Sequence, residues 1–403
     1  MPPLSLFEGD LVNRIFARLH LGSRRPAHLL GRAAVLMALT WLPTAVMALL
    51  SGPPYVGLQI DGSNFFADFA AYAQFLVALP LFVLAEAIVG RGTRDAAAEF
   101  AESGLVRQGD IEKLASLHSH IERRRKSWWS DVICFGIGCL LSAAVIWTEL
   151  LHPPAHTWHT YVEDHVRYLS APGYWEFFVA LPLLNYWWLR QIWKIVLWCR
   201  YLYGVSRLPL DLVATHPDRT GGIGFISEVQ GHFAWVILAY GISNVAATVG
   251  YKLALENASL WDPPVWGPIV GFVIVAPLLF LLPLFMFTKQ LFRTKRRALK
   301  LYRERVMEHA RLFEAQLLPR SAEEIKTLSG AVDLNVMSQF SKLFESCENM
   351  RVVPFDLKSM SQLFASTLGT VVGILPAQHL EQPLGRFLEF LVKITEFLGH
   401  GSH

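Results

Sequence analysis

Two carboxylates lie inside a long apolar stretch of the chain, and their type and placement suggest chemistry. Asp68 and Glu86 belong to residues 64–91, a stretch long enough to cross a bilayer, which takes about 20 residues. Their spacing equals about five helical turns, so they share one face with Tyr72 and lie about 27 Å apart along the axis. A carboxylate inside a span is costly and usually faces protein or water. We therefore expect residues 65–90 to form an inner helix.

These carboxylates have two interpretations with different consequences. In the first, both line a water-filled path, and in a symmetric oligomer they form a ring at each mouth that selects cations. In the second, which we favour for Glu86, the carboxylate pairs with Arg190 or Lys194, which lie one helical turn apart in a later apolar segment. Such a pair would hold two helices together and conduct nothing. Asp68 has no evident partner beyond Lys252.

A glycine-rich segment, HPDRTGGIGF, occupies residues 216–225 between two apolar stretches. Glycines allow backbone N–H groups to approach a phosphate, which an arginine could clamp, but neither a P-loop nor a dinucleotide-binding pattern is present. We favour a sharp turn with a capping aspartate and glycines at positive φ, placed where it could form part of a gate or a small-ligand site. The residues of this turn are His216, Asp218, Arg219, Gly221, Gly222 and Gly224.

A loop expected on the outer side is rich in histidine. His152, His156 and His159 could bind Zn²⁺, which prefers tetrahedral nitrogen and carboxylate ligands, but Pro153 and Pro154 prevent a simple helical site. A polar loop that responds to acid is favoured over a metal site, because histidine titrates near pH 6.5.

No enzyme constellation stands out, and we expect no other cofactor. The chain contains neither HExxH nor GxSxG. The basic run at residues 123–126 directly precedes an apolar segment, so it is expected to contact lipid headgroups rather than nucleic acid.

The composition is that of a membrane protein. Of the 403 residues, 53% are hydrophobic and 17% are charged, whereas globular proteins average about 25% charged residues. The apolar segments predict an all-α, polytopic fold with six transmembrane helices and a cytosolic helical domain. The predicted spans are residues 31–50, 65–90, 128–150, 174–203, 232–255 and 265–292.

Basic residues indicate the orientation. The three loops expected outside contain one basic residue, Arg167, so the positive-inside rule places both termini in the cytosol. Residues 1–30 form a basic N-terminal segment, and residues 93–127 form a cytosolic helical insertion. Residues 399–403 have the composition of a cloning remnant.

The last predicted span continues into an amphipathic stalk. Pro277 and Pro283 can kink this span and act as hinges, or they can fix a static bend. Residues 293–398 form the stalk and a helical tail, whose apolar stripes need a partner, so we expect a homo-oligomer or a cytosolic protein partner. Residues 363–375 suit a buried or interfacial helix better than a seventh span.

The predicted function is ion permeation by an oligomeric channel for cations. Its path would be lined by Asp68, Tyr72, Glu86, Asn244 and Thr248. Two alternatives remain open: a proton-coupled secondary transporter that uses the same carboxylates, and a scaffold or signalling protein that acts through its cytosolic helices.

Overall fold

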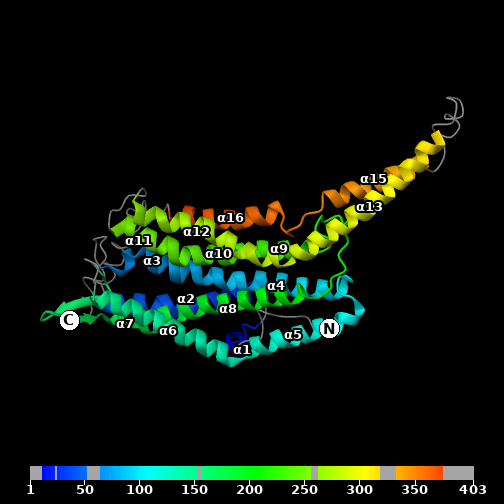
Figure 1. Ribbon diagram of the computed structural model, residues 1–403. Coiled ribbons are helices and arrows are strands. Elements are labelled where there is room, and N and C mark those ends of the chain that lie inside the picture. Colours follow the sequence, from blue (N-terminus) through cyan, green and yellow to red (C-terminus); the bar gives the residue numbers. More distant parts are fainter. Residues whose placement is uncertain are drawn as a thin grey trace.

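The computed structural model describes residues 11–22, 25–51, 64–151, 157–255, 262–317 and 333–374, and these fold almost entirely into helices (Figure 1). The first helical elements are α1 (Leu11–Arg18), α2 (Pro26–Ser51), η1 (Phe65–Ala67), α3 (Phe69–Ala71), η2 (Tyr72–Ala78), α4 (Leu79–Glu102), η3 (Gln108–Asp110), α5 (Ile111–Lys126) and α6 (Trp128–Leu151). After a hairpin of β1 (Thr160–Glu163) and β2 (Val166–Leu169) come α7 (Ala171–Trp175), η4 (Glu176–Ala180), α8 (Leu181–Val205), α9 (Phe225–His232), α10 (Ala234–Tyr240), η5 (Gly241–Ala246) and α11 (Ala247–Leu255). The last elements are α12 (Pro263–Leu281), η6 (Leu282–Phe287), α13 (Thr288–Leu317), α15 (Asp333–Glu348) and α16 (Leu357–Ile374).

Five helices of the described residues are long and apolar enough to cross a membrane, and each overlaps a predicted span. They are Pro26–Ser51, Phe69–Glu102, Trp128–Leu151, Phe225–Gly250 and Pro263–Glu308. The span predicted at residues 174–203 falls on a sixth long helix, formed by α7, η4 and α8, which is not among these five. The fold is therefore that of an integral membrane protein, while the count of six spans and the orientation of the termini stay predictions.

The helix that begins after Asp68 and carries Glu86 near its middle is the inner one, as predicted. In Figure 1 it lies between α10 and the pair α2 and α8, and α4 contacts α2, α8, α9 and α10. Its most apolar 18-residue window is 61% buried, against 22–56% for the other four candidate spans. Its polar side chains therefore face protein, and the cost of burying them must be met by contacts within the bundle.

Three of the bundle helices contain a π-helical stretch, which the sequence did not predict. The stretches are η2, η4 and η5, and η2 packs against η5 and α2. The Gln74 side chain in η2 donates to the carbonyl oxygen of Ser243 in η5 at 3.2 Å. Because π-helical turns are uncommon and often occur at functional sites, three of them in one bundle mark it as a candidate region.

The predicted insertion at residues 93–127 is helical, but its first part is not a separate helix. The first continues α4 to Glu102, and the second is α5, which packs against α8 through the buried residues Leu114 and Ile121. His118 of α5 lies 3.0 Å from the Tyr201 hydroxyl of α8.

The last predicted span is interrupted, although the sequence predicted a helix that runs unbroken into the stalk. A 3-10 segment, η6, separates α12 from α13. Pro283 is the second residue of η6, whereas Pro277 lies within α12 and does not end it. Proline removes one backbone hydrogen bond, and the tighter 3-10 turns accommodate that loss. The bend predicted at Pro283 therefore coincides with a change of helix type, and its role as a hinge stays a prediction.

The apolar stripe of the stalk is covered from within the chain. Beyond the bundle, α13 and α15 lie side by side and project away from it (Figure 1). Leu299 and Tyr302 of α13 pack against the core cluster that contains Cys347 and Met350. The Lys295 ammonium donates to the Met350 carbonyl oxygen at 2.8 Å. This part of the stripe needs no second copy of the chain, so the predicted homo-oligomer has to be tested separately.

The final described helix, α16, departs from the predicted cytosolic tail. It lies along α10 and α12 rather than with the stalk, and it also contacts α9 and η5 (Figure 1). Asp356 caps it, accepting from the Ser359 backbone N–H at 2.9 Å and from the Ser227 hydroxyl at 3.0 Å. Residues 363–375 were predicted to form a buried or interfacial helix, and their described part is a helix that buries Leu363 and Thr370 but exposes Leu368 and Val372. Its place relative to the membrane stays a prediction. Within the described residues, α16 packs against the bundle rather than with the stalk. The reason is a face of buried Ser and Thr that fits the glycines of α9 and η5.

The close approach of α16 generates a stability prediction. A Cβ at Gly241 would lie 2.7 Å from Thr370 Cγ2 and 2.8 Å from Phe272 Cε1, whereas a Cβ at Gly136 of α6 meets nothing within 4 Å. We expect Gly241→Ala to destabilise the protein by about 1–3 kcal/mol through overpacking. The control Gly136→Ala should be neutral or stabilising by up to about 1 kcal/mol, because alanine is the better helix former. Thermal unfolding in detergent checks the two signs, and equal shifts would contradict the packing of α16.

Candidate functional site

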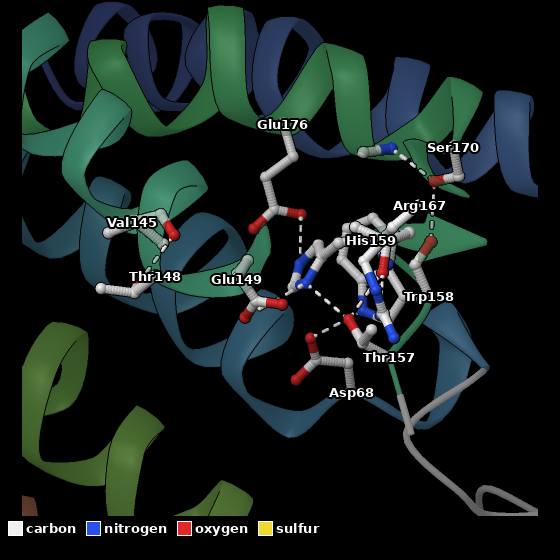
Figure 2. A network of polar contacts seen from close by, with 12 residues as sticks. Asp68, Val145, Thr148, Glu149, Thr157, Trp158, His159, Arg167, Ser170 and Glu176 are labelled. Carbon is white, nitrogen blue, oxygen red and sulfur yellow. Dashed lines mark hydrogen bonds and ion pairs between the residues drawn. The ribbon is translucent and has the colours of Figure 1, made fainter. Parts of the chain in front are cut away.

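One end of the bundle contains a buried group of carboxylates around a histidine, shown in Figure 2. His159 lies between two glutamates: its Nδ1 is 3.8 Å from Glu149 Oε1, and its Nε2 is 3.7 Å from Glu176 Oε2. Its Nδ1 is also 2.9 Å from the Thr157 hydroxyl. Asp68 approaches from the start of α3. We call Asp68, Glu149, His159 and Glu176 the His159 cluster.

The β-hairpin brings residues 157–159, which directly precede it, to this position. A two-residue turn joins its strands at Asp164 and His165, whose φ angles are 48° and 62°. Ser170, which follows β2, caps α7 by accepting from the Gly173 N–H at 3.0 Å and donates to the Trp158 carbonyl oxygen at 2.7 Å. A Cβ at Gly173 would collide with the His159 carbonyl oxygen, so only glycine allows this approach. The hairpin and the start of α7 therefore hold His159 over the bundle.

Asp68 is fixed by hydrogen bonds rather than by a cation. One carboxylate oxygen accepts from the Ala70 backbone N–H at 2.8 Å, which caps α3, and the other accepts from Trp158 Nε1 at 3.0 Å. Trp158 is 2% exposed and packs edge-on against Phe65, with ring centroids 4.9 Å apart. Lys252, the partner that the sequence suggested for Asp68, instead lies 3.5 Å from the Pro264 carbonyl oxygen.

The His159 cluster contains three carboxyl groups and one imidazole in a buried setting. Among the described residues, Glu149 Oε2, Glu176 Oε2 and His159 Nε2 are buried without a hydrogen-bond partner. Arg167, the nearby basic residue in Figure 2, donates to the Thr160 hydroxyl at 2.8 Å. Burial alone would lower the pKa of His159, but Glu176, followed by Glu149 and Asp68, outweighs it and raises that pKa above its ordinary value. The arrangement therefore favours binding of a proton on the imidazole.

A second buried network lies further along the same inner helix. Arg190 donates to both Glu86 oxygens, with Nη1 2.9 Å from Oε2 and Nη2 3.0 Å from Oε1, and Lys194 Nζ is 3.0 Å from Oε1. Asn13 donates to Glu86 Oε1 at 3.3 Å and accepts from Arg32 Nη1 at 3.0 Å. The ion pair that the sequence offered as an alternative is therefore formed. We call these five residues the Glu86 network.

An apolar core separates the two groups. Phe75, Leu79, Phe82 and Leu184 belong to one packed cluster and are each at most 4% exposed. These side chains fill the space between the two groups along this face of the inner helix. The two carboxylates predicted to line a path are thus each enclosed in a separate polar group.

The other residues of the predicted path are not gathered with Asp68 and Glu86. Tyr72 lies near Asp68 but donates to the Phe66 carbonyl oxygen at 3.1 Å. Asn244 and Thr248 are exposed at the surface of the bundle, where the Asn244 amide donates to the Tyr240 carbonyl oxygen of its own helix. Of the residues predicted to line one path, Asp68, Tyr72 and Glu86 therefore lie inside the bundle, whereas Asn244 and Thr248 lie on its surface.

The glycine-rich segment forms the predicted turn. The Asp218 carboxylate accepts from the backbone N–H groups of Thr220, Gly222 and Gly224 at 2.8–3.2 Å, and it lies 2.9 Å from His216 Nδ1. Although burial acts to raise the pKa of Asp218, these hydrogen bonds outweigh it and lower that pKa. The carboxylate therefore acts as the cap of the turn.

Positive φ angles explain the composition of this turn. Arg219, Gly221 and Gly222 have φ angles of 56°, 71° and 96°, a region that glycine adopts at little cost. The turn lines a cleft of about 630 Å³ together with the end of α4 and the segment before α16, and the Arg219 carbonyl oxygen accepts from the Arg351 N–H at 2.6 Å. The role of this cleft as a gate or ligand site stays a prediction.

The predicted metal site falls partly outside the described residues, because His152 and His156 are not among them. Within the part of the chain that the structure describes, no group of three or more His, Cys, Asp or Glu side chains could hold a metal ion. His159, the described member of the predicted triad, is engaged with Glu149 and Glu176.

Sequence analysis missed Glu149 and Glu176. Glu149 lies near the end of one apolar segment and Glu176 near the start of the next, so their positions alone placed both at the same end of the bundle as His159. Their position at the same end of the bundle as His159 could have identified them. Charged residues are common near the ends of membrane helices, however, so this position did not set Glu149 and Glu176 apart from other charged residues. No protein-family model, curated protein or solved structure matches the chain, so the site is interpreted from its own geometry.

The Glu86 network generates a prediction about stability. Glu86→Gln removes the carboxylate on which Arg190 and Lys194 converge, and both cations are buried, so we expect a loss of about 3–5 kcal/mol. Lys194→Met keeps the two-bond contact between Arg190 and Glu86 and should cost far less. Unfolding of both variants in detergent provides the comparison, and the reverse order would show that the network is not the main contact of this carboxylate.

The raised pKa of His159 generates a pH prediction. Because the folded protein binds this proton more tightly than the unfolded chain, the cluster stabilises the fold fully below the ordinary pKa of 6.5. That contribution is lost as the pH rises through the higher pKa of the folded state. Melting temperatures measured across this range should fall more steeply for the natural protein than for His159→Asn, and parallel curves would contradict the assignment.

Proposed function

We propose that the chain is a proton-coupled membrane transporter in which the His159 cluster takes up and releases the coupling proton. The observation that carries this proposal is an imidazole placed between a buried carboxylate, Glu176, and a half-buried one, Glu149, at 3.7 Å and 3.8 Å. Ionisable groups within membrane bundles are expensive and commonly mark proton or ion pathways. Histidine titrates close to physiological pH, which suits it to reversible proton exchange.

The geometry of the His159 cluster supports reversible transfer of a proton between the imidazole and its neighbouring carboxylates. A protonated imidazole can donate to Glu149 through Nδ1 or to Glu176 through Nε2 once either gap closes by less than about 1 Å. Asp68 adds a further carboxylate, which accepts a hydrogen bond from Trp158, next to His159 in the chain. A small movement of the hairpin would therefore change which carboxylate shares the proton.

The Glu86 network supports a change of state near the middle of the inner helix. Protonation of Glu86 would remove the charge that balances Arg190 and Lys194, and it would weaken the contact between α4 and α8. Because the strength of this buried ion pair depends on one proton, protonation of Glu86 could switch the bundle between two arrangements of α4 and α8. Asn13 and Arg32 extend this element to α1 and α2.

The packed core favours a transporter over an open pore. The His159 cluster and the Glu86 network are separated by tightly packed aliphatic and aromatic side chains, so transfer between them requires the helices to move. The π-helical stretches η2, η4 and η5 are local irregularities of a kind that is frequent at functional sites. These features support a closed state of an alternating cycle.

A second candidate function rests on the stalk. The hairpin of α13 and α15 projects beyond the bundle, and α13 has exposed charged side chains along its length, which suits a protein partner (Figure 1). A signalling protein or scaffold of this shape would bind its partner without moving any ion.

A pH jump applied to proteoliposomes on a solid-supported membrane discriminates between these functions without knowledge of the substrate. We expect a transient current from proton binding, and His159→Asn should reduce the displaced charge about tenfold or more through loss of the titrating group. The matched control is His165→Asn, an exposed histidine in the same hairpin at a positive φ that asparagine tolerates. A sustained current would instead favour the predicted cation channel, and the absence of any current in the natural protein would favour the scaffold.

A further inference from the structure

Helix α1 binds the side of the bundle with one face only. Phe16 is 4% exposed and packs edge-on against Trp187 of α8, with ring centroids 6.4 Å apart. The Arg32 side chain of α2 donates to the Leu21 carbonyl oxygen at 2.8 Å and to Asn13 Oδ1 at 3.0 Å. One arginine therefore holds α1 both near its start and just after its end, which fixes the helix against a single turn of α2.

The remaining surface of α1 divides into an apolar row and a basic row. Leu11, Ile15 and Leu19 follow each other at four-residue spacing and are 44–52% exposed. Arg14 and Arg18 are exposed as well, and both lie about 160° around the helix from Phe16. An exposed apolar row beside a basic row is typical of a helix that lies in the plane of the membrane interface.

Exposed tryptophans mark the level of the lipid headgroups on the side where the stalk projects. Trp128 and Trp129 are 55% and 58% exposed, and their rings stack with centroids 4.2 Å apart. They begin α6 and directly follow the basic run at residues 123–126. Tryptophan is enriched at the level of the headgroups in membrane proteins, so this pair indicates where the bilayer ends.

Helix α1 lies close to that level. A Cβ at Gly138 of α6 would lie 3.1 Å from the Tyr186 nitrogen of α8, so these two residues face each other. Because α6 and α8 run antiparallel, Trp128, ten residues before Gly138, and Lys194, eight residues after Tyr186, lie within about 3 Å of one level. Lys194 belongs to the Glu86 network, as does Asn13 of α1. Figure 1 likewise shows α1 level with the junction of α5 and α6.

The charge of this part of the chain determines which lipid fits. Residues 11–60 contain five arginines and no Asp, Glu or Lys. Arginine recognises phosphate oxygens, and basic segments beside a span are attracted to anionic leaflets. We propose that α1 binds anionic phospholipid in the leaflet on the stalk side. Leu11, Ile15 and Leu19 enter the hydrocarbon, while Arg14 and Arg18 bind the headgroup phosphates.

Lipid cross-linking on the full-length protein tests the preference for anionic headgroups. The protein is reconstituted in phosphatidylcholine vesicles with a trace of photoactivatable phosphatidylglycerol or of the matching photoactivatable phosphatidylcholine, and labelled peptides are identified by mass spectrometry. We expect phosphatidylglycerol to label residues 11–19 about tenfold more strongly, because two basic side chains near the surface attract it. The double variant Arg14→Gln, Arg18→Gln should lose most of this preference.

The matched control removes the same charge from α13. The double variant Arg296→Gln, Arg297→Gln changes two exposed arginines of the stalk and should leave the labelling ratio at residues 11–19 unchanged. Equal labelling by the two lipids in the natural protein would overturn the proposal. An equal loss of preference in both double variants would also overturn it, because the attraction would then come from net charge rather than from α1.

Thiol accessibility tests whether the apolar row lies in the bilayer. In the same vesicles, Ile15→Cys should react with a membrane-impermeant maleimide about tenfold more slowly than Ser119→Cys, because the reactive thiolate forms in water. Ser119 is exposed on α5 and lies beyond Trp128 on the stalk side, so the ratio does not depend on the orientation of the protein in the vesicles. Mass spectrometry separates these sites from the four natural cysteines. Equal rates would place the row in water and overturn the proposal.

Discussion

Burial of charge is the constraint on which this structure depends. Glu86 lies on the innermost helix, where an isolated carboxylate would be too costly, and Arg190 and Lys194 of α8 meet that cost with direct contacts of 2.9–3.0 Å. The same contacts determine how α4 and α8 face each other, and Asn13 and Arg32 bring α1 and α2 into the arrangement. The Glu86 network is thus balanced by Arg190 and Lys194, whereas the described residues of the His159 cluster include no basic group other than His159 itself. This difference makes the His159 cluster the better candidate for proton exchange.

Around this inner helix, each neighbouring element approaches for an identifiable reason. The β-hairpin reaches the bundle because Ser170 and Gly173 allow its backbone to lie against α7, and Trp158 then reaches Asp68. Helix α16 reaches α10 because Gly241 leaves space for Thr370. The α13 and α15 hairpin closes on its own apolar stripe and projects from the bundle (Figure 1). The arrangement of the bundle therefore depends on close contacts at Gly173 and Gly241, on the His159 cluster and on the Glu86 network.

Much of this architecture follows from periodicity and the cost of burying charge. The apolar segments predicted the main helices, the two carboxylates predicted which helix is innermost, and the glycines after Asp218 predicted its turn. The His159 cluster was not predictable in this way, because its residues are distant in sequence: they belong to the cap of α3, to α6, to the loop before β1 and to η4. The hairpin turn at Asp164 and His165 lacks the usual Asn-Gly or Asp-Gly pair, and π-helical stretches have no comparable sequence signal. The position of α16 depends on the fit between its Ser and Thr face and glycines more than a hundred residues earlier in the chain.

The central claim is that His159 binds a proton more readily than an ordinary histidine because Glu149 and Glu176 lie on either side of it. Direct titration of His159 by ¹⁵N NMR of the histidine-labelled protein in bilayers tests this claim most closely. The account predicts a pKa above the ordinary value of 6.5 that falls when Glu176 is replaced by glutamine. A His159 that stays neutral down to pH values below 6.5, or whose titration ignores the Glu176 substitution, would contradict it.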